Sequence, residues 1–258
     1  MCELLGLSAN TPADIRFSFA GLRQRGGNTG VHSDGWGISL YEGRGSRSFH
    51  DPKPSYSSEV AHFFHTSAIK SKLIISHIRQ ANRGRVCLEN THPFTRELWG
   101  YDWVFAHNGQ LKNIKKKSLE FYKPRGTTDS EYAFCYMMDS IRNAFPERPK
   151  KEKELWQFIE SLANEINQHG IFNFLLSDSK HMYAYCSNRM CWLTRKYPFG
   201  RAKLVDTGDV IDLSTSFSKN DVVTLIASHA LTENEDWHCM KKGEFKVFNN
   251  GKSRQLAA

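Results

Sequence analysis

The sequence predicts an α+β fold in which two mainly antiparallel sheets pack face to face. Predicted strands precede and follow a pair of long helical segments at the centre of the chain. This order lacks the regular strand–helix alternation of a doubly wound fold, so antiparallel sheets are favoured. A sandwich of two sheets with helices on both outer faces fits it. The 258 residues, 40% hydrophobic and 24% charged, suit one large soluble domain or two small ones.

Four segments in the first half of the chain have strand character. They are 3–9, 34–41, 72–78 and 103–106. The third is strongly apolar and alternates poorly, as expected of a strand that is buried on both faces. The fourth ends at His107-Asn108-Gly109, and Asn-Gly is a strong turn signal. We therefore expect the chain to turn at Asn108 and Gly109.

The first helix is expected directly after the first strand. Thr11-Pro12 would open it, because proline suits the first turn of a helix. Apolar residues then recur at helical spacing, at Ile15, Phe19 and Leu22. These three side chains are expected to face inward.

The remaining helices are expected at 58–69, from 128 onward and at 151–168. Thr128 and Glu131 match the two partners of a capping box, in which each side chain bonds to the other residue's backbone N–H. Strands are expected again at 171–176, 182–186, 190–193 and 222–227. Residues 1–248 are interpreted as one domain, and 249–258 as a loose C-terminal tail.

Bulk composition limits the classes of partner. Six cysteines occur without a secretory signal in front of them, and the longest apolar runs are too short to span a bilayer, so a cytoplasmic protein with reduced thiols is expected. The net charge of +8 and the pI of about 9.2 raise the possibility of nucleic-acid binding. The densest basic run, 115–117, is short, which favours a solvated basic surface. His62 and His65 lack a third ligand nearby, so no metal site is expected.

Cys2 stands directly behind the initiator Met1. If Met1 is removed, the mature chain begins with a residue that carries a thiol and a free α-amine. Such an amine, with an ordinary pKa of ~7.7–8.0, can act as the base that activates the thiol. The alternative is that Cys2 is one more small apolar residue at the start of a chain.

Three other segments carry groups that complement a reactive thiol. Arg79 ends an apolar strand, where a guanidinium can clamp a carboxylate or form an ordinary surface salt bridge. The amide of Asn108 and the backbone N–H of Gly109 can donate to a developing oxyanion, or the pair can form a type I′ turn. Asp129 can hold an ammonium group or act only as a helix-start carboxylate. A substrate with an α-carboxylate, an α-ammonium group and a side-chain carbonyl would use all three, and glutamine and γ-glutamyl compounds have this chemistry.

From Cys2 to Phe134, these motifs resemble in order the class II glutamine amidotransferases, which are N-terminal nucleophile hydrolases. The resemblance implies a four-layer αββα fold. It also implies hydrolysis of glutamine to glutamate and ammonia through a γ-glutamyl thioester, with no cofactor. Cys2 would be the nucleophile, and its α-amine the base.

The same resemblance implies roles for other residues. Arg25 and Gly26 match the family's Arg-Gly near the nucleophile, and Asn108 and Gly109 match its oxyanion hole. Arg79 would hold the substrate carboxylate, Asp129 its amine, and His92 would have a supporting role. Gln80 and Asn82 stand where aminosugar synthases of the family have Trp and Thr, so secondary substrate contacts at Asn82 are expected to differ.

The length of the chain bears on its partners. The glutaminase domain would fill the 258 residues and leave no room for an acceptor site, which resembles the compact branch of the family that includes γ-glutamyl amide hydrolases. A separate synthase subunit could still receive the ammonia. The alternative from another class is a non-catalytic protein that keeps the fold and senses or binds glutamine. Retention of Met1 would favour that alternative, because the α-amine would then lie away from the thiol.

Overall fold

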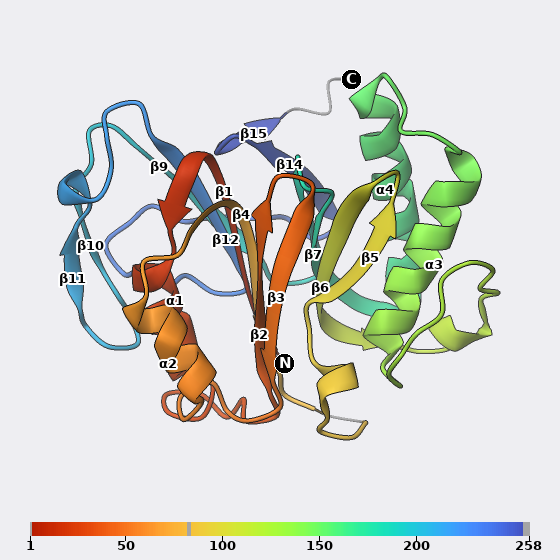
Figure 1. Cartoon of the computed structure of the whole chain (residues 1–258), viewed down its shortest axis with the longest axis horizontal. Helices are drawn as coiled ribbons and strands as arrows, with labels where there is room; N and C mark the ends of the chain where they lie inside the picture. Colours follow the sequence, from red (N-terminus) through yellow and green to blue (C-terminus); the bar gives the residue numbers. More distant parts are fainter. Residues whose placement is uncertain (1, 82–83, 255–258) are drawn as a thin grey trace.

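Two antiparallel sheets form the centre of the computed structural model, which describes residues 2–81 and 84–254 (Figure 1). Over this part of the chain, the larger sheet has seven strands in the order β13-β9-β12-β1-β4-β2-β3. Their bounds are β1 (Glu3–Asp14), β2 (Trp36–Glu42), β3 (Gly45–Asp51), β4 (Lys70–Ile78), β9 (Cys191–Lys196), β12 (Val222–Ala227) and β13 (His238–Cys239). β1 therefore lies at the centre of this sheet, between β12 and β4.

The second sheet has six strands among the described residues, in the order β15-β14-β8-β7-β6-β5. Their bounds are β5 (Phe94–Leu98), β6 (Tyr101–Leu111), β7 (Gly170–Ser177), β8 (Met182–Cys186), β14 (Glu244–Asn249) and β15 (Lys252–Arg254). A short hairpin, β10 (Arg201–Lys203) and β11 (Val210–Asp212), stands apart from both sheets. Three 3-10 turns complete the described elements, η1 (Leu88–Asn90), η2 (Ile114–Lys116) and η3 (Leu213–Thr215).

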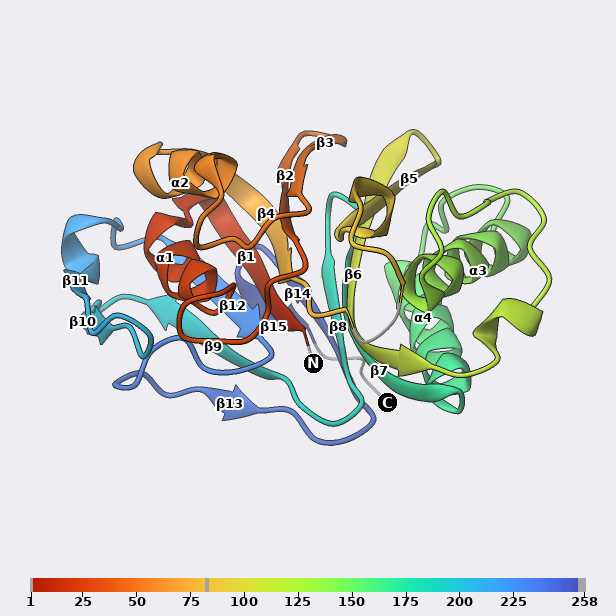
Figure 2. The same ribbon diagram turned by 90° about the horizontal axis from the view of Figure 1, so that it is seen from below.

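Helices cover the outer face of each sheet, so the sandwich has four layers (Figure 2). α1 (Arg16–Gln24) and α2 (Glu59–Thr66) pack on the seven-stranded sheet. α3 (Asp129–Ala144) and α4 (Glu152–Asn167) pack on the six-stranded sheet. The predicted αββα sandwich is therefore confirmed.

Side-chain alternation decides which residues enter the layer between the sheets. Along β1, Leu5 and Leu7 pack toward α1 and α2, while Leu4 lies in the central layer. Successive side chains of a strand point to opposite faces, so Cys2 shares the direction of Leu4. Ala106 of β6 also lies in the central layer, and Asn108 shares its direction. The pleat thus directs Cys2 and Asn108 toward the same interlayer space.

The expected start of the first helix, at Thr11-Pro12, is wrong. β1 continues through both residues to Asp14, because the strand resumes pairing with β4 after an irregularity, at Ala13 opposite Ser71. α1 begins at Arg16, whose backbone N–H donates to Asp14 Oδ1 at 2.9 Å. The expected inward positions are nevertheless confirmed, since all three apolar side chains are buried, Ile15, Phe19 and Leu22.

The turn expected at Asn108-Gly109 is also wrong. β6 runs through both residues, and they pair with Asn173 and Phe172 of β7. A Cβ atom added at Gly109 would lie 1.9 Å from the carbonyl oxygen of Ile171. The glycine is therefore required for close approach of two strands.

The predicted start of the loose C-terminal tail, at residue 249, is too early. Asn249 is the last residue of β14, and Lys252–Arg254 returns as β15 to pair with it. The hairpin is tied to the other sheet, because the N–H of Gly251 donates to Ser8 Oγ at 3.3 Å and its carbonyl accepts from Thr224. Residues 255–258 lie outside the described residues.

The capping box at the start of α3 is half confirmed. Thr128 is the N-cap, and its hydroxyl accepts from the backbone N–H of Glu131. The carboxylate of Glu131 turns elsewhere, to the N–H groups of Arg125 and Gly126 and to the guanidinium of Arg96. Glu131 thereby fixes the loop that leads into the helix, and with it the position of Asp129.

Candidate active site

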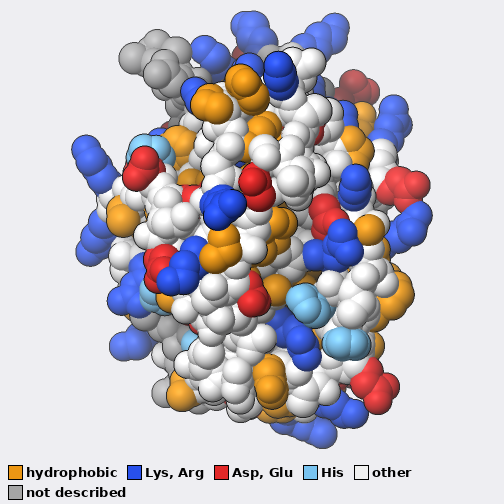
Figure 3. All heavy atoms as spheres, turned by 90° about the vertical axis from the view of Figure 1, so that its left-hand side faces the viewer, with side chains coloured by type: hydrophobic (Ala, Val, Ile, Leu, Met, Phe, Trp, Pro, Cys, Tyr) orange, Lys and Arg blue, Asp and Glu red, His pale blue; other side chains and the backbone are white. Residues whose placement is uncertain are grey.

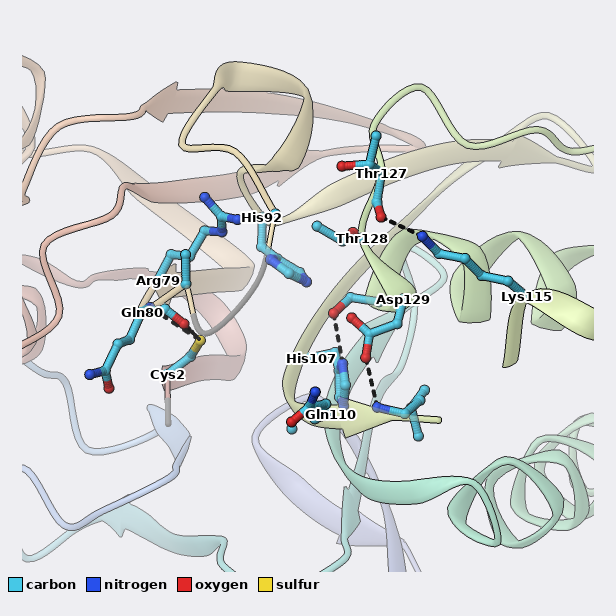
Figure 4. Close-up of a pocket in the computed structure, with 15 residues that line it drawn as sticks. Cys2, Arg79, Gln80, His92, His107, Gln110, Lys115, Thr127, Thr128 and Asp129 are labelled. Atoms are coloured by element: carbon cyan, nitrogen blue, oxygen red, sulfur yellow. Dashed lines mark hydrogen bonds between the residues drawn. The ribbon is translucent and has the colours of Figure 1, made fainter. Parts of the chain in front are cut away.

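One cavity gathers residues that are far apart in the sequence. Its volume is about 240 Å³, and its wall includes Cys2, Arg79, Gly109 and Asp129. Figure 4 shows Cys2 and Arg79 on one side of the cavity and Asp129 on the other. The first two adjoin the ends of β1 and β4, and Asp129 begins α3. The cavity therefore lies where the two halves of the sandwich meet, and its volume is slightly below the roughly 300–1,000 Å³ of typical small-molecule sites.

Cys2 is half-buried, and its sulfur lies against the backbone of Gln80. The Gln80 N–H donates to Sγ at 3.3 Å, and the thiol can donate to the Gln80 carbonyl at 3.5 Å. Burial raises the pKa of the Cys2 thiol above its ordinary value, and the Gln80 backbone bond and the charge of Arg79 oppose that rise. The thiol is thus protonated near neutral pH and needs a base before it can attack a carbonyl.

Arg79 is buried beside Cys2 and held by backbone groups. Its Nη1 donates to the carbonyl oxygens of Asp34 and Arg85 at 3.4 and 3.2 Å. Asp34 also binds the backbone of this segment. Its N–H donates to the Arg79 carbonyl, and its carboxylate accepts from the Ala81 N–H at 2.7 Å. The guanidinium is therefore fixed in direction, which suits recognition of a planar carboxylate.

Asp129 faces Arg79 across the cavity. One carboxylate oxygen accepts from the backbone N–H of Leu111 at 2.6 Å, which ties the start of α3 to the end of β6. Lys115 lies beside it in the wall, and its Nζ donates to the Thr127 carbonyl at 2.7 Å (Figure 4). One end of the cavity thus carries the guanidinium of Arg79, and the other carries the carboxyl group of Asp129 next to the ammonium group of Lys115.

Histidines form the floor between these two ends. His92 is buried, and its ring packs in tilted contacts between those of His77 and Phe94, with centroids 4.2 and 4.3 Å away. Neither ring nitrogen of His77 or His92 has a hydrogen-bond partner among the described residues. Burial lowers the pKa of His77 to about 3 and that of His92 well below its ordinary value, so both rings are neutral. This agrees with a supporting role for His92 rather than proton transfer.

His107 is a site residue that the sequence reasoning did not select. Its Nε2 lies 3.0 Å from the Ile171 carbonyl, which assigns the proton to Nε2, so Nδ1 accepts from the Ser130 hydroxyl at 2.8 Å. Burial lowers the pKa of His107, with partial opposition from Asp129. The neutral ring joins β6 to the first turn of α3. Its position directly before Asn108 in the sequence is the feature that could have identified it.

The two expected oxyanion donors lie at different depths. Gly109 lines the cavity, whereas Asn108 is buried behind it. Asn108 Nδ2 donates to Ser228 Oγ at 3.2 Å, and its Oδ1 has no hydrogen-bond partner among the described residues. Its carbonyl accepts from Asn173 Nδ2 at 3.0 Å. Asn108 is thus held through its side chain by Ser228 and through its backbone by Asn173.

Arg25 and Gly26 do not appear among the described residues that line the cavity. The buried guanidinium of Arg25 pairs with Glu3 and Asp206 at 3.2 and 2.9 Å, and it also donates to the carbonyl of Ala230. Gly26 permits close packing, because an added Cβ would lie 1.9 Å from Ser55 Oγ. Arg25 therefore supports the strand that begins next to Cys2, and Gly26 packs against Ser55. Asn82, the other expected contact, lies outside the described residues.

Other features bear on the expected ligands and partners. No group of three or more His, Cys, Asp or Glu side chains within residues 2–81 and 84–254 is placed to hold a metal ion. Of the helices in that part of the chain, none has the length and apolar character needed to cross a membrane. On the face shown in Figure 3, Lys and Arg side chains are scattered among acidic ones and form no continuous basic area.

Comparison with known proteins agrees with this architecture. The profile of the glutamine amidotransferases class-II matches residues 1–258. The chain is 52% identical over 248 residues to the protein YafJ of Escherichia coli (strain K12), which covers 96% of this chain and 97% of YafJ. A crystal structure of a predicted glutamine amidotransferase from Pseudomonas aeruginosa PA01 superposes with a TM-score of 0.75 at 42% identity, over 98% of this chain and 99% of that one.

A more distant structure supports the fold alone. The glutamine phosphoribosylpyrophosphate amidotransferase of B. subtilis superposes with a TM-score of 0.61 at 18% identity. The match covers 99% of this chain and 49% of that enzyme, which is therefore about twice as long. Because the family profile spans the whole sequence and the near relatives match along their full length, this chain belongs to the class II glutamine amidotransferases.

Proposed function

We propose that this chain hydrolyses the side-chain amide of glutamine, or of a γ-glutamyl compound, through a thioester on Cys2. The observation that carries the proposal is the single cavity whose wall includes Cys2, Arg79 and Asp129. A carboxylate bound at Arg79 and an ammonium group bound at Asp129 would fix the α-carbon of an amino acid. Its side-chain carbonyl would then extend toward the sulfur.

The first half of the reaction forms the thioester. With Met1 removed, the α-amine of Cys2 takes the thiol proton, and Sγ forms a bond to the side-chain carbonyl carbon while the carbonyl π electrons move to oxygen. The Gly109 N–H and the Asn108 amide donate to this oxyanion. The C–N bond then breaks, and the α-ammonium returns the proton to the departing nitrogen, which leaves as ammonia or an amine.

The second half removes the acyl group. Water attacks the thioester carbonyl and gives a proton to the α-amine, and the same two donors hold the second oxyanion. The C–S bond breaks, the sulfur recovers its proton, and glutamate is released. Arg25 serves this cycle by positioning the start of β1, since Glu3, its ion-pair partner, follows Cys2 directly in sequence. Gly26 keeps the neighbouring backbone close to Ser55.

The need for a base links activity to processing of the N-terminus. The pKa of the Cys2 thiol is raised by burial, so a thiol without a neighbouring amine would be a poor nucleophile near neutral pH. Retention of Met1 would leave a glutamine-binding pocket without this base. That protein would be the non-catalytic alternative. The intact mass of the purified protein distinguishes the chain that keeps Met1 from the chain that begins at Cys2.

Glutamate release by the purified chain tests the proposal, with glutamine and a series of γ-glutamyl amides as substrates. We expect turnover by the wild type and none by Cys2→Ala. Cys87→Ala is the matched control, because Cys87 is also a half-buried free thiol but does not line the cavity, and it should keep wild-type turnover. Turnover by Cys2→Ala equal to that of the wild type would exclude the mechanism. Activity that appears only with an added synthase subunit would instead favour ammonia transfer to a partner.

A further inference from the structure

Ser228 connects the strand of the nucleophile to the amide that is expected to hold the oxyanion. It follows β12 directly, and its side chain is buried. Its Oγ accepts from the Leu4 N–H at 3.1 Å, and its own N–H donates to the Leu4 carbonyl at 3.2 Å. The same Oγ lies 3.2 Å from Asn108 Nδ2. One hydroxyl therefore contacts both the backbone two residues beyond Cys2 and the side chain of Asn108.

The hydrogen bonds around the Ser228 hydroxyl leave one buried acceptor without a donor. Ser228 Oγ accepts twice, from Leu4 and from Asn108, while the buried Oδ1 of Asn108 accepts from no described residue. A buried polar atom without a partner costs about 1–3 kcal/mol. The arrangement thus leaves an acceptor on Asn108 empty next to a hydroxyl that carries a proton.

Rotation of the Asn108 side-chain amide by half a turn gives its oxygen a hydrogen-bond donor. Its oxygen then faces Ser228 and accepts the hydroxyl proton, and Ser228 Oγ still accepts the N–H of Leu4. The nitrogen moves to the position that Oδ1 occupies, where Oδ1 itself has no hydrogen-bond partner among the described residues. Nitrogen and oxygen of an amide are exchanged by such a rotation without any change of shape, so the packing is unaffected.

We propose that Ser228 is a positioning residue that turns the Asn108 amide so that Nδ2 is free to donate to the reaction's oxyanion. This inference rests on the function proposed above. Ser228 donates to Oδ1 and thereby prevents the amide from rotating back. Because it also holds Leu4, it fixes the Asn108 donor relative to the strand that carries Cys2. Asn173 acts from the other side by holding the Asn108 carbonyl.

The kinetic test uses Ser228→Ala. Loss of an oxyanion donor typically costs ~10²–10³ in turnover, so an amide that is free to rotate should lower kcat by about 10- to 100-fold. The KM for glutamine should change little, since Arg79 and Asp129 are untouched. Ser8→Ala is the matched control, because Ser8 is equally buried on β1 and its hydroxyl also accepts one backbone N–H. Ser8→Ala should keep the wild-type kcat, and Ser228→Thr, which keeps the hydroxyl, should restore most of it.

A double-mutant cycle separates positioning from a general structural effect. If Ser228 acts through Asn108, Ser228→Ala should cost nothing further in the Asn108→Ala background. Equal losses in both backgrounds, or a wild-type kcat in Ser228→Ala, would overturn the inference while leaving the proposed function intact.

A second readout does not depend on turnover. The side-chain amide signals of Asn108 in a nitrogen-15 spectrum, identified by their loss in Asn108→Ala, should shift in Ser228→Ala and stay in place in Ser8→Ala. If the wild type hydrolyses no substrate, the proposed function fails, and this spectrum still decides the role of Ser228. Unshifted Asn108 amide signals in Ser228→Ala would overturn it.

Discussion

The sulfur of Cys2 lies 3.3 Å from the backbone nitrogen of Gln80, one residue beyond Arg79. This contact follows from the pairing of β1 with β4, in which Glu3 stands opposite Ile78. The same pairing therefore places the thiol beside the guanidinium. The proposed nucleophile, Cys2, and the proposed carboxylate clamp, Arg79, are thus placed side by side by one strand register, and a slip of that register would separate them.

The pH dependence of hydrolysis should report the α-amine of Cys2. Because burial raises the pKa of the thiol, the amine must be neutral to take its proton. We expect kcat/KM for glutamine to fall about tenfold per pH unit below the amine's ordinary pKa of ~7.7–8.0, and to level off above it. Initial rates from pH 6 to 10 check this. A continued rise well above that range, without a plateau, would show that ionisation of the thiol itself limits the rate.

Asp129→Asn should weaken binding of the substrate's amino group while it keeps the acceptor for the Leu111 N–H. Hydrogen bonds to charged groups are worth about 1.5–3 kcal/mol, so kcat/KM for glutamine should fall about 10- to 100-fold. Glutamine without its α-amino group, 4-carbamoylbutanoate, serves as the control substrate. Its kcat/KM should be low in the wild type and should not fall further in the variant. Equal losses for both substrates would place Asp129 outside the amine site.

Arg25→Met should act on stability and leave substrate binding alone. It would remove the guanidinium from the buried carboxylate of Glu3, which keeps His229 as an ionisable partner, and from the carboxylate of Asp206. Breaking a buried pair in this way costs about 3–5 kcal/mol of unfolding free energy. Denaturant unfolding measures the loss, and Arg47→Met, which removes an exposed pair with Glu42, should cost less than about 1 kcal/mol. A raised KM with unchanged stability would instead assign Arg25 to the substrate.

The buried histidines should make stability depend on pH. The pKa of His77 is about 3 in the folded chain, and it is about 6.5 when the ring is exposed by unfolding. The unfolded state therefore binds the extra proton below pH 6.5, and this part of the stability is lost as the pH falls from about 6.5 to about 3. The slope is about 1.4 kcal/mol per pH unit for one such group. In His77→Phe, the slope of the unfolding free energy against pH should therefore be smaller by that amount between pH 6 and 4. An unchanged slope would contradict a His77 that is neutral in the folded chain.

Local sequence patterns predicted the parts of the fold that depend on nearby residues. Helical spacing of Ile15, Phe19 and Leu22 and the N-cap at Thr128 depend on nearby residues, and both appear in the structure. Gly109 had the opposite outcome. Asn-Gly is a turn signal locally, but pairing with β7 keeps the strand straight, and only the position of the Ile171 carbonyl explains the glycine.

Long-range contacts explain what the sequence could not reveal. Arg25 carries an Arg-Gly motif, yet its partners include Asp206 and the carbonyl of Ala230, from the far end of the chain. Ser228 is likewise separated from Leu4 by more than two hundred residues and has no motif around it. Such roles depend on which strands become neighbours, and no local pattern records that.

The most direct test of the central claim is peptide mapping of the acylated enzyme. The wild type is mixed with glutamine, quenched in acid within one turnover and digested, and the N-terminal peptide is weighed by mass spectrometry. We expect a peptide that begins at Cys2, without Met1, and that carries a γ-glutamyl group on the sulfur. A chain that turns over glutamine while Met1 is retained, or an acyl group on another residue, would contradict it.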